Sequence, residues 1–159
     1  MAITYPPWYK GGFPDVEVLL ETLFMPMISG VTPVHWFPTE DIIETTLNAG
    51  NGYLSIYRTG GKINHDQNRD EPNVQFVALT KSRDESWKLI EFIRQVLSKF
   101  EESEAVVPGT NNQLGCLGEI LGPQLTRAEM RDERIVPVTF TLLTRKPGGL
   151  GNYHEALGL

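Results

Sequence analysis

The stretch NVQFVALTKSRDESWKLIEFIRQVLSKFE, residues 73–101, decides the fold, because it places a buried strand directly before a long amphipathic helix. Residues 73–80 carry apolar side chains on both faces, which is typical of a strand inside a sheet. Ser82 and Glu85 have the spacing of a capping box, and the apolar residues that follow recur along one side of a helix. At 1.5 Å per residue, the helix over residues 82–101 is roughly 30 Å long and can cover most of a sheet of four or five strands.

The elements on either side of this stretch are shorter. Asp15 after Pro14 begins a helix, and Thr39 is a candidate N-cap for another. Residues 135–145 alternate apolar and polar side chains as a strand does. The predicted elements are helices over 15–25 and 40–47 and strands over 31–37, 53–58, 105–107, 114–121 and 135–145, with a charged connection over 125–134.

This order predicts an α+β fold in which one long helix and one or two shorter helices pack on a mainly antiparallel sheet of about five strands. One face of the sheet is only partly covered in this inventory, and an open apolar face often finds its cover in a partner. A chain of 159 residues is most simply one domain, which we place at residues 13–146. Residues 1–12, with the aromatic rings of Trp8 and Tyr9, form an N-terminal arm, and the glycine-rich residues 147–159 form a flexible tail.

The composition of the chain argues against several classes of protein. A net charge of −6 argues against a protein whose main task is to grip nucleic acid, since phosphate binding needs clustered Lys and Arg. The single cysteine, Cys116, excludes an internal disulfide and is interpreted as a small, partly buried residue. No secretory signal begins the sequence and no apolar run reaches membrane length, so no membrane partner is expected.

The stretch GGKINHDQNRDEPN, residues 60–73, contains almost no apolar side chain and is interpreted as a long loop between two strands. Its Asp66, Asn68 and Asp70 have the spacing that begins an EF-hand loop, but Glu71 stands where glycine is required. A weaker metal site formed by His65, Asp66 and Asp70 stays open as an alternative. The more common interpretation of such a composition is a solvated surface loop.

No pattern for enzymatic catalysis is found. The sequence has no G-x-S-x-G turn, and His35, His65 and His154 fall in a strand, a loop and a tail. No acid is set among apolar residues that would raise its pKa. We therefore expect neither catalytic residues nor a cofactor or bound metal.

Several segments together resemble the tail terminator, or tail completion, proteins of long-tailed bacteriophages. They are FPDVEVLLETLFMPMI, GYLSIYRTGG, RDEPNVQFVALTKSRDESWKLIEFIRQVL and LGEILGPQLTRAEMRDERIVPVTFTLLTR. In order, they are similar to the family's first helix, the strand before its long loop, the strand and helix after that loop, and its closing strands. The resemblance covers roughly residues 13–146.

The resemblance implies a non-enzymatic virion protein at the head-proximal end of the tail, assembled in the host cytoplasm. Six copies form a ring that caps the finished tube and offers a surface to the head. The implied partners are other copies of the chain, the major tail tube protein and the head-to-tail connector protein. DNA only passes through the ring, and acids lining the hole would discourage it from sticking.

Under this hypothesis, the residues 60–73 contact a neighbouring subunit or the tube. Exposed ion pairs contribute little free energy but help to fix register. The expected contact residues, together with the aromatic rings of the arm, are Lys62, His65, Asp66, Arg69, Asp70, Trp8 and Tyr9. The alternatives are a head-to-tail connector or minor tail protein and, from another class, a small metal-dependent hydrolase that uses residues 60–73.

Overall fold

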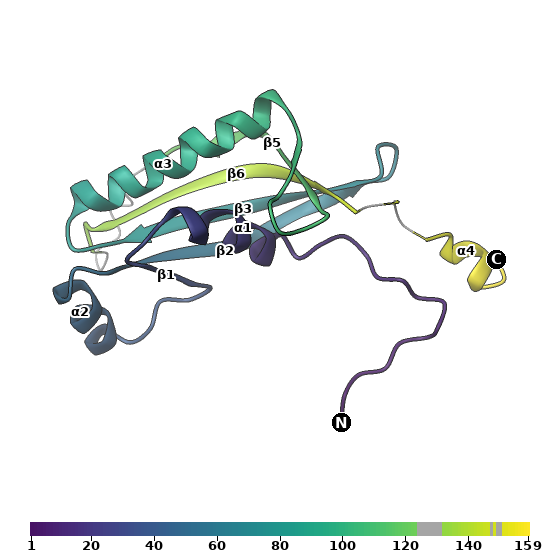
Figure 1. The fold of residues 1–159 in the computed structure, drawn as a ribbon, viewed down its shortest axis with the longest axis horizontal. Helices are drawn as coiled ribbons and strands as arrows, with labels where there is room; N and C mark the ends of the chain where they lie inside the picture. The colour runs from purple at the N-terminus through teal and green to yellow at the C-terminus, as the bar shows by residue number, and fades with distance from the viewer. Residues whose placement is uncertain (124–131, 147, 149–150) are drawn as a thin grey trace.

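A six-stranded sheet forms the centre of the computed structural model, which describes residues 1–123, 132–146, 148 and 151–159 (Figure 1). The strand order is β1-β2-β3-β6-β5-β4. The strands are Val31–Val34 (β1), Gly52–Asn64 (β2), Arg69–Leu79 (β3), Ala105–Val106 (β4), Gln113–Leu121 (β5) and Ile135–Arg145 (β6). The predicted connection over residues 125–134 falls largely outside the described residues.

The α+β class is confirmed, but the sheet is mixed and has six strands rather than about five. Strand β1 runs parallel to β2, and the other pairs are antiparallel. The cause is helix α2, Glu40–Asn48, which lies between β1 and β2 in the chain. A parallel neighbour in a sheet needs a long crossover connection, which α2 provides here, and the two strands alone do not reveal this.

The largest difference from the sequence analysis lies in residues 60–73, which do not form a loop. Strand β2 continues to Asn64 and β3 already begins at Arg69, so that only residues 65–68 turn the chain. Beyond Arg58, one residue bulges out of the ladder and the pairing resumes at Gly60 and Asn73. The polar stretch is therefore the outer half of a long β-hairpin (Figure 1).

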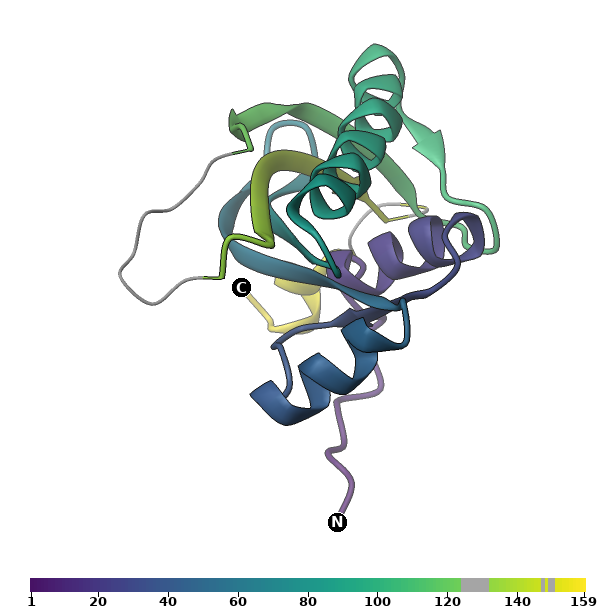
Figure 2. The same ribbon diagram turned by 90° about the vertical axis from the view of Figure 1, so that its left-hand side faces the viewer.

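One face of the sheet carries the main core. Helices α1, Val16–Phe24, and α3, Arg83–Glu102, both pack on this face, as Figure 2 shows. Both helices begin as predicted, because Asp15 accepts a hydrogen bond from the amide of Glu17 at 2.9 Å, and Ser82 accepts one from Glu85 at 3.2 Å. The side chains fully buried here include Phe24, Leu20, Leu54, Ile56, Phe76, Ile90, Ile93, Leu97 and Leu142.

The side of α3 that faces the sheet is not formed by apolar residues alone. Trp87 is 41% exposed, whereas the polar Ser86 is fully buried. The hydroxyl of Ser86 accepts from the amide of Thr80 at 3.0 Å and lies 2.9 Å from the Thr80 hydroxyl. These hydrogen bonds satisfy a serine inside the core and join the start of the helix to the end of β3.

The opposite face is covered only at one end, by α2. Leu47 of this helix packs with Tyr53 and Leu79 in a small second cluster. Thr39 stands at the N-cap of α2 as predicted, although its side chain makes no capping hydrogen bond. The rest of this face has no helix over it among the described residues, as the sequence analysis expected.

In Figure 1 the C-terminal tail lies at the right and the N-terminal arm runs below the sheet. The arm, residues 1–12, contains neither helix nor strand. Separately, a 3-10 turn, Met25–Met27, follows α1. The tail contains a short helix, α4, Tyr153–Ala156, where no regular element was expected. The flexibility of the tail stays a prediction.

Candidate functional site

The tip of the β2–β3 hairpin holds three of the predicted contact residues on its surface. Lys62, His65 and Asp66 are exposed. The turn is fixed by its own hydrogen bonds, since Asn64 accepts from the amide of Gln67 at 3.1 Å and Asn68 has a positive φ of 50°. Asparagine tolerates this left-handed conformation better than most residues. The tip is therefore a defined projection whose charged side chains face solvent.

Asp70 is not available at the surface, because it forms an ion pair within the hairpin. Its carboxylate accepts two hydrogen bonds from the guanidinium of Arg58, at 2.7 and 2.9 Å, and the residue is only 3% exposed. The pair lies beside residues 13–17 at the start of α1. Arg58 was missed by sequence reasoning, although its alternation with Leu54 and Ile56 places it on the helix-covered face.

Arg69 is also engaged within the hairpin. Its guanidinium donates to Glu71 at 2.8 Å, and the amide of Asn64 donates to the same carboxylate oxygen at 3.0 Å. These hydrogen bonds, that of Asn64 first and that of Arg69 second, hold the pKa of Glu71 below its ordinary value. The inner part of residues 60–73 is thus held by internal charge pairs.

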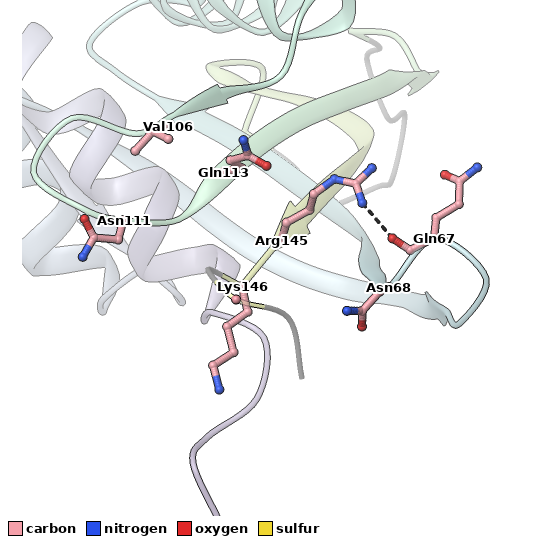
Figure 3. Close-up of a pocket in the computed structure, with 8 residues that line it drawn as sticks. Gln67, Asn68, Val106, Asn111, Gln113, Arg145 and Lys146 are labelled. Atoms are coloured by element: carbon pink, nitrogen blue, oxygen red, sulfur yellow. Dashed lines mark hydrogen bonds between the residues drawn. The ribbon is translucent and has the colours of Figure 1, made fainter. Parts of the chain in front are cut away.

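Arg145, at the end of β6, connects the hairpin tip to Glu104, which directly precedes the edge strand β4. It donates to the carbonyl oxygen of Gln67 at 2.7 Å and to the carboxylate of Glu104 at 2.8 and 3.2 Å. This arginine lines a pocket of about 490 Å³. Figure 3 shows it there beside Gln113 and Lys146. Sequence reasoning gave no role to Arg145, because its partners are distant in the chain.

The arm is held at its base by the C-terminal tail. The ring of Tyr153 lies 5.6 Å from that of Trp8 and 5.7 Å from that of Tyr9. Its hydroxyl donates to the carbonyl oxygen of Gly11 at 2.7 Å. Trp8 and Tyr9 are each 40% exposed, so these two predicted contact residues keep part of their ring surface free.

A second surface lies on the open face of the sheet, where a groove of about 500 Å³ runs beside α2. Trp36 and Tyr57 line it with their rings 5.1 Å apart. At its rim Arg134 binds Asp132 and donates to Glu44 at 2.7 Å. The hydrogen bond from Arg134 is the main reason why the pKa of Asp132 lies below its ordinary value.

The residues that could support metal or thiol chemistry are separated. Within the described ranges, no three His, Cys, Asp or Glu side chains gather as a metal site would require. The Nδ1 atom of His35 lies 3.5 Å from the carboxylate of Glu17. His65 lies elsewhere, at the tip of the hairpin. Burial raises the pKa of the Cys116 thiol to about 11, in agreement with the predicted structural role.

The described part of the chain contains no helix that is long and apolar enough to cross a membrane. What it presents instead are three surfaces: a braced hairpin, a groove on an open sheet, and an extended aromatic arm. These features define a small α+β protein that is suited to contacts with other protein chains.

A comparison with family models identifies the family. Residues 12–151 match the model of the phage tail termination protein family, and the chain belongs to this family. It is thus a structural protein of the phage tail, as the resemblance of its segments indicated. No curated protein matches the chain at the significance required.

Proposed function

We propose that the protein forms a ring that caps the tail tube, ends the addition of tube subunits and offers the surface to which the head is joined. Membership of the tail termination family over residues 12–151 is the observation that carries this proposal. In this role the protein sits at the head-proximal end of the tail in the virion, is assembled in the host cytoplasm and catalyses no reaction.

The described surfaces suit a closed ring. A ring of identical chains needs two different patches on each chain that complement each other. The hairpin projects at one end of the sheet and the groove lies beside α2 at the other end of β2, so the two surfaces can meet different partners (Figure 1). Further copies of the chain, the major tail tube protein and the head-to-tail connector protein are the partners we propose.

The hairpin tip is the proposed contact for a neighbouring subunit or the tube. Because Arg58, Arg69 and Arg145 brace it internally, little conformational entropy is lost when it binds. Lys62, His65 and Asp66 carry the contact, while Asp70 and Arg69 hold its shape. A double variant, Asp66→Ala with Asp70→Ala, would mix a surface effect with a folding effect, because Asp70 is buried. Lys62→Ala with Asp66→Ala changes exposed residues alone and is the cleaner test.

Assembly of tails in the absence of heads tests the proposal. Purified tube protein polymerised with the native chain should give tubes of limited length that carry a ring at one end in negative-stain images. The Lys62→Ala, Asp66→Ala variant should leave tubes uncapped, and these tubes should fail to join heads that are added afterwards. The urea midpoint of the variant itself should equal that of the native chain. Tubes that are capped equally well by this variant would exclude the hairpin contact, and a chain that binds only isolated connectors would be a connector component instead.

A further inference from the structure

The first part of the arm exposes apolar side chains that its own chain leaves uncovered. Ile3 is 80% exposed and Tyr5 is 66% exposed. Pro6 and Pro7 follow them, and the chain from Met1 to Phe13 contains no acid. A segment with two consecutive prolines loses little conformational entropy on binding, because proline already restricts its backbone.

The base of the arm is fixed, and residues 5–7 contact it, because the carbonyl oxygen of Pro6 accepts from the amide of Tyr9 at 3.0 Å and the ring of Tyr5 lies 5.4 Å from that of Tyr9. Tyr153 holds Gly11 through its hydroxyl, and Lys146 donates to the carbonyl oxygens of Lys10 and Gly11 at 2.8 and 3.3 Å. Figures 1 and 2 both show the chain before this anchor leading away from the sheet. The anchor therefore directs residues 1–7 toward a surface outside their own domain.

The groove on the open sheet face has the chemistry to receive such a segment. Trp36, 74% exposed, and Tyr57 form an aromatic wall, and Val77 lies in the groove. Aromatic-lined grooves are the usual receptors for proline-rich extended segments. Among the described residues that line the groove, the acids are Glu40, Glu44 and Asp132 and the arginine is Arg134, whereas residues 1–7 of the arm contain no acid and Lys10 follows them.

Helix α1, into which the arm leads, and the groove of the same chain lie on opposite faces of the sheet. The arm leads into α1, which packs on the same face as Arg58 and Phe76. The groove is lined by Ser55 and Gln75, whose side chains point to the other face because successive strand residues alternate. A second copy, with its groove turned toward the first copy's arm, is the nearest way to bring the two together.

We propose that residues 1–7 of one copy lie in the groove of a second copy, with Pro6 and Pro7 against Trp36 and Tyr57 and with Tyr5 beside the acidic rim. This inference rests on the proposed function, since the ring supplies the neighbouring copy. With this contact, the open face of the sheet becomes part of the interface between subunits. The arm then joins neighbouring copies at a surface that the hairpin does not use.

Disulfide cross-linking between two differently tagged full-length chains tests the contact. One chain carries Ile3→Cys and the other Gln75→Cys, at a position within the groove. The native Cys116 is buried with a raised pKa and should not compete. Mild oxidation of the mixture should give a heterodimer at least ten times more abundant than a control pair in which Lys88→Cys, exposed on α3, replaces Gln75→Cys.

Cross-linking no greater than the control would overturn the inference. A second result would also overturn it. If a chain that carries both cysteines forms the disulfide within itself, with the same yield at every dilution, the arm occupies the groove of its own chain. Light scattering on the same samples separates this inference from the proposed function. A ring without the cross-link removes only the arm contact, whereas a cross-linked dimer that forms no ring supports the contact and contradicts the ring.

Discussion

The ion pair between Arg58 and Asp70 stabilises the hairpin. Asp70 is 4% exposed at its side chain, while its partner Arg58 is 37% exposed. Removing the aspartate leaves an arginine that solvent can partly reach, so the cost is smaller than for a fully buried pair. We expect Asp70→Ala to lower the free energy of unfolding by about 1–3 kcal/mol.

Asp66→Ala is the matched control, because Asp66 is exposed on the same hairpin. Its effect should stay within about 0.5 kcal/mol. Urea unfolding of the two variants, followed by circular dichroism, measures the difference. Equal midpoints for both variants would show that the Arg58 pair adds nothing to stability.

The lowered pKa of Glu71 predicts a dependence on pH. A carboxylate whose pKa is lower in the folded protein contributes stability above its ordinary pKa, 4.5, and loses it as pH falls through the folded value. Glu71→Gln should therefore be less stable than the native chain at pH 7, and the gap should narrow as pH falls below 4.5. Urea midpoints of both proteins at pH 7 and at pH 3.5 test this, and a gap that is the same at both values would contradict it.

At the scale of elements, helices were easier to predict than the hairpin. Asp15 and Ser82 are capping residues that act locally, and the periodicity from Ile90 to Leu97 reflects one buried side. Residues 60–73 carry no such signal, because charge pairs replace apolar contacts along these strands. Their partners become neighbours only once the strands pair, so a polar sequence was interpreted as a loop.

Two adjacent glycines in β2 offer a test of this hairpin. Gly61 has a φ of +121°, and a Cβ added there would lie 2.6 Å from the Cα of Pro72, whereas no atom lies within 4 Å of a Cβ added at Gly60. Gly61→Ala should thus cost on the order of 2 kcal/mol and loosen the hairpin, while Gly60→Ala should have little effect. Hydrogen exchange of the β2 and β3 amides, compared between the variants, measures this. Equal protection would mean that the backbone at Gly61 is not restricted.

At the scale of the whole molecule, the two faces of the sheet have different roles. The helix-covered face holds the main core, and the other face keeps an open groove beside α2. The sequence indicated the open face, because the inventory held too few helices for both. It could not indicate the parallel β1, whose position depends on the path of α2, nor the groove that Trp36 forms after β1.

Phe24 joins the parts of the core, and its removal should affect the molecule as a whole. It is fully buried, and its ring meets Phe76 of β3 at 5.9 Å and Phe92 of α3 at 6.5 Å. Phe24→Ala should lower the free energy of unfolding by about 3–5 kcal/mol, because the cavity spans α1, the sheet and α3. Val18→Ala, on the exposed side of α1, is the control and should change little. If fluorescence and circular dichroism gave separate midpoints for Phe24→Ala, α1 would be unfolding on its own and would not belong to one cooperative core.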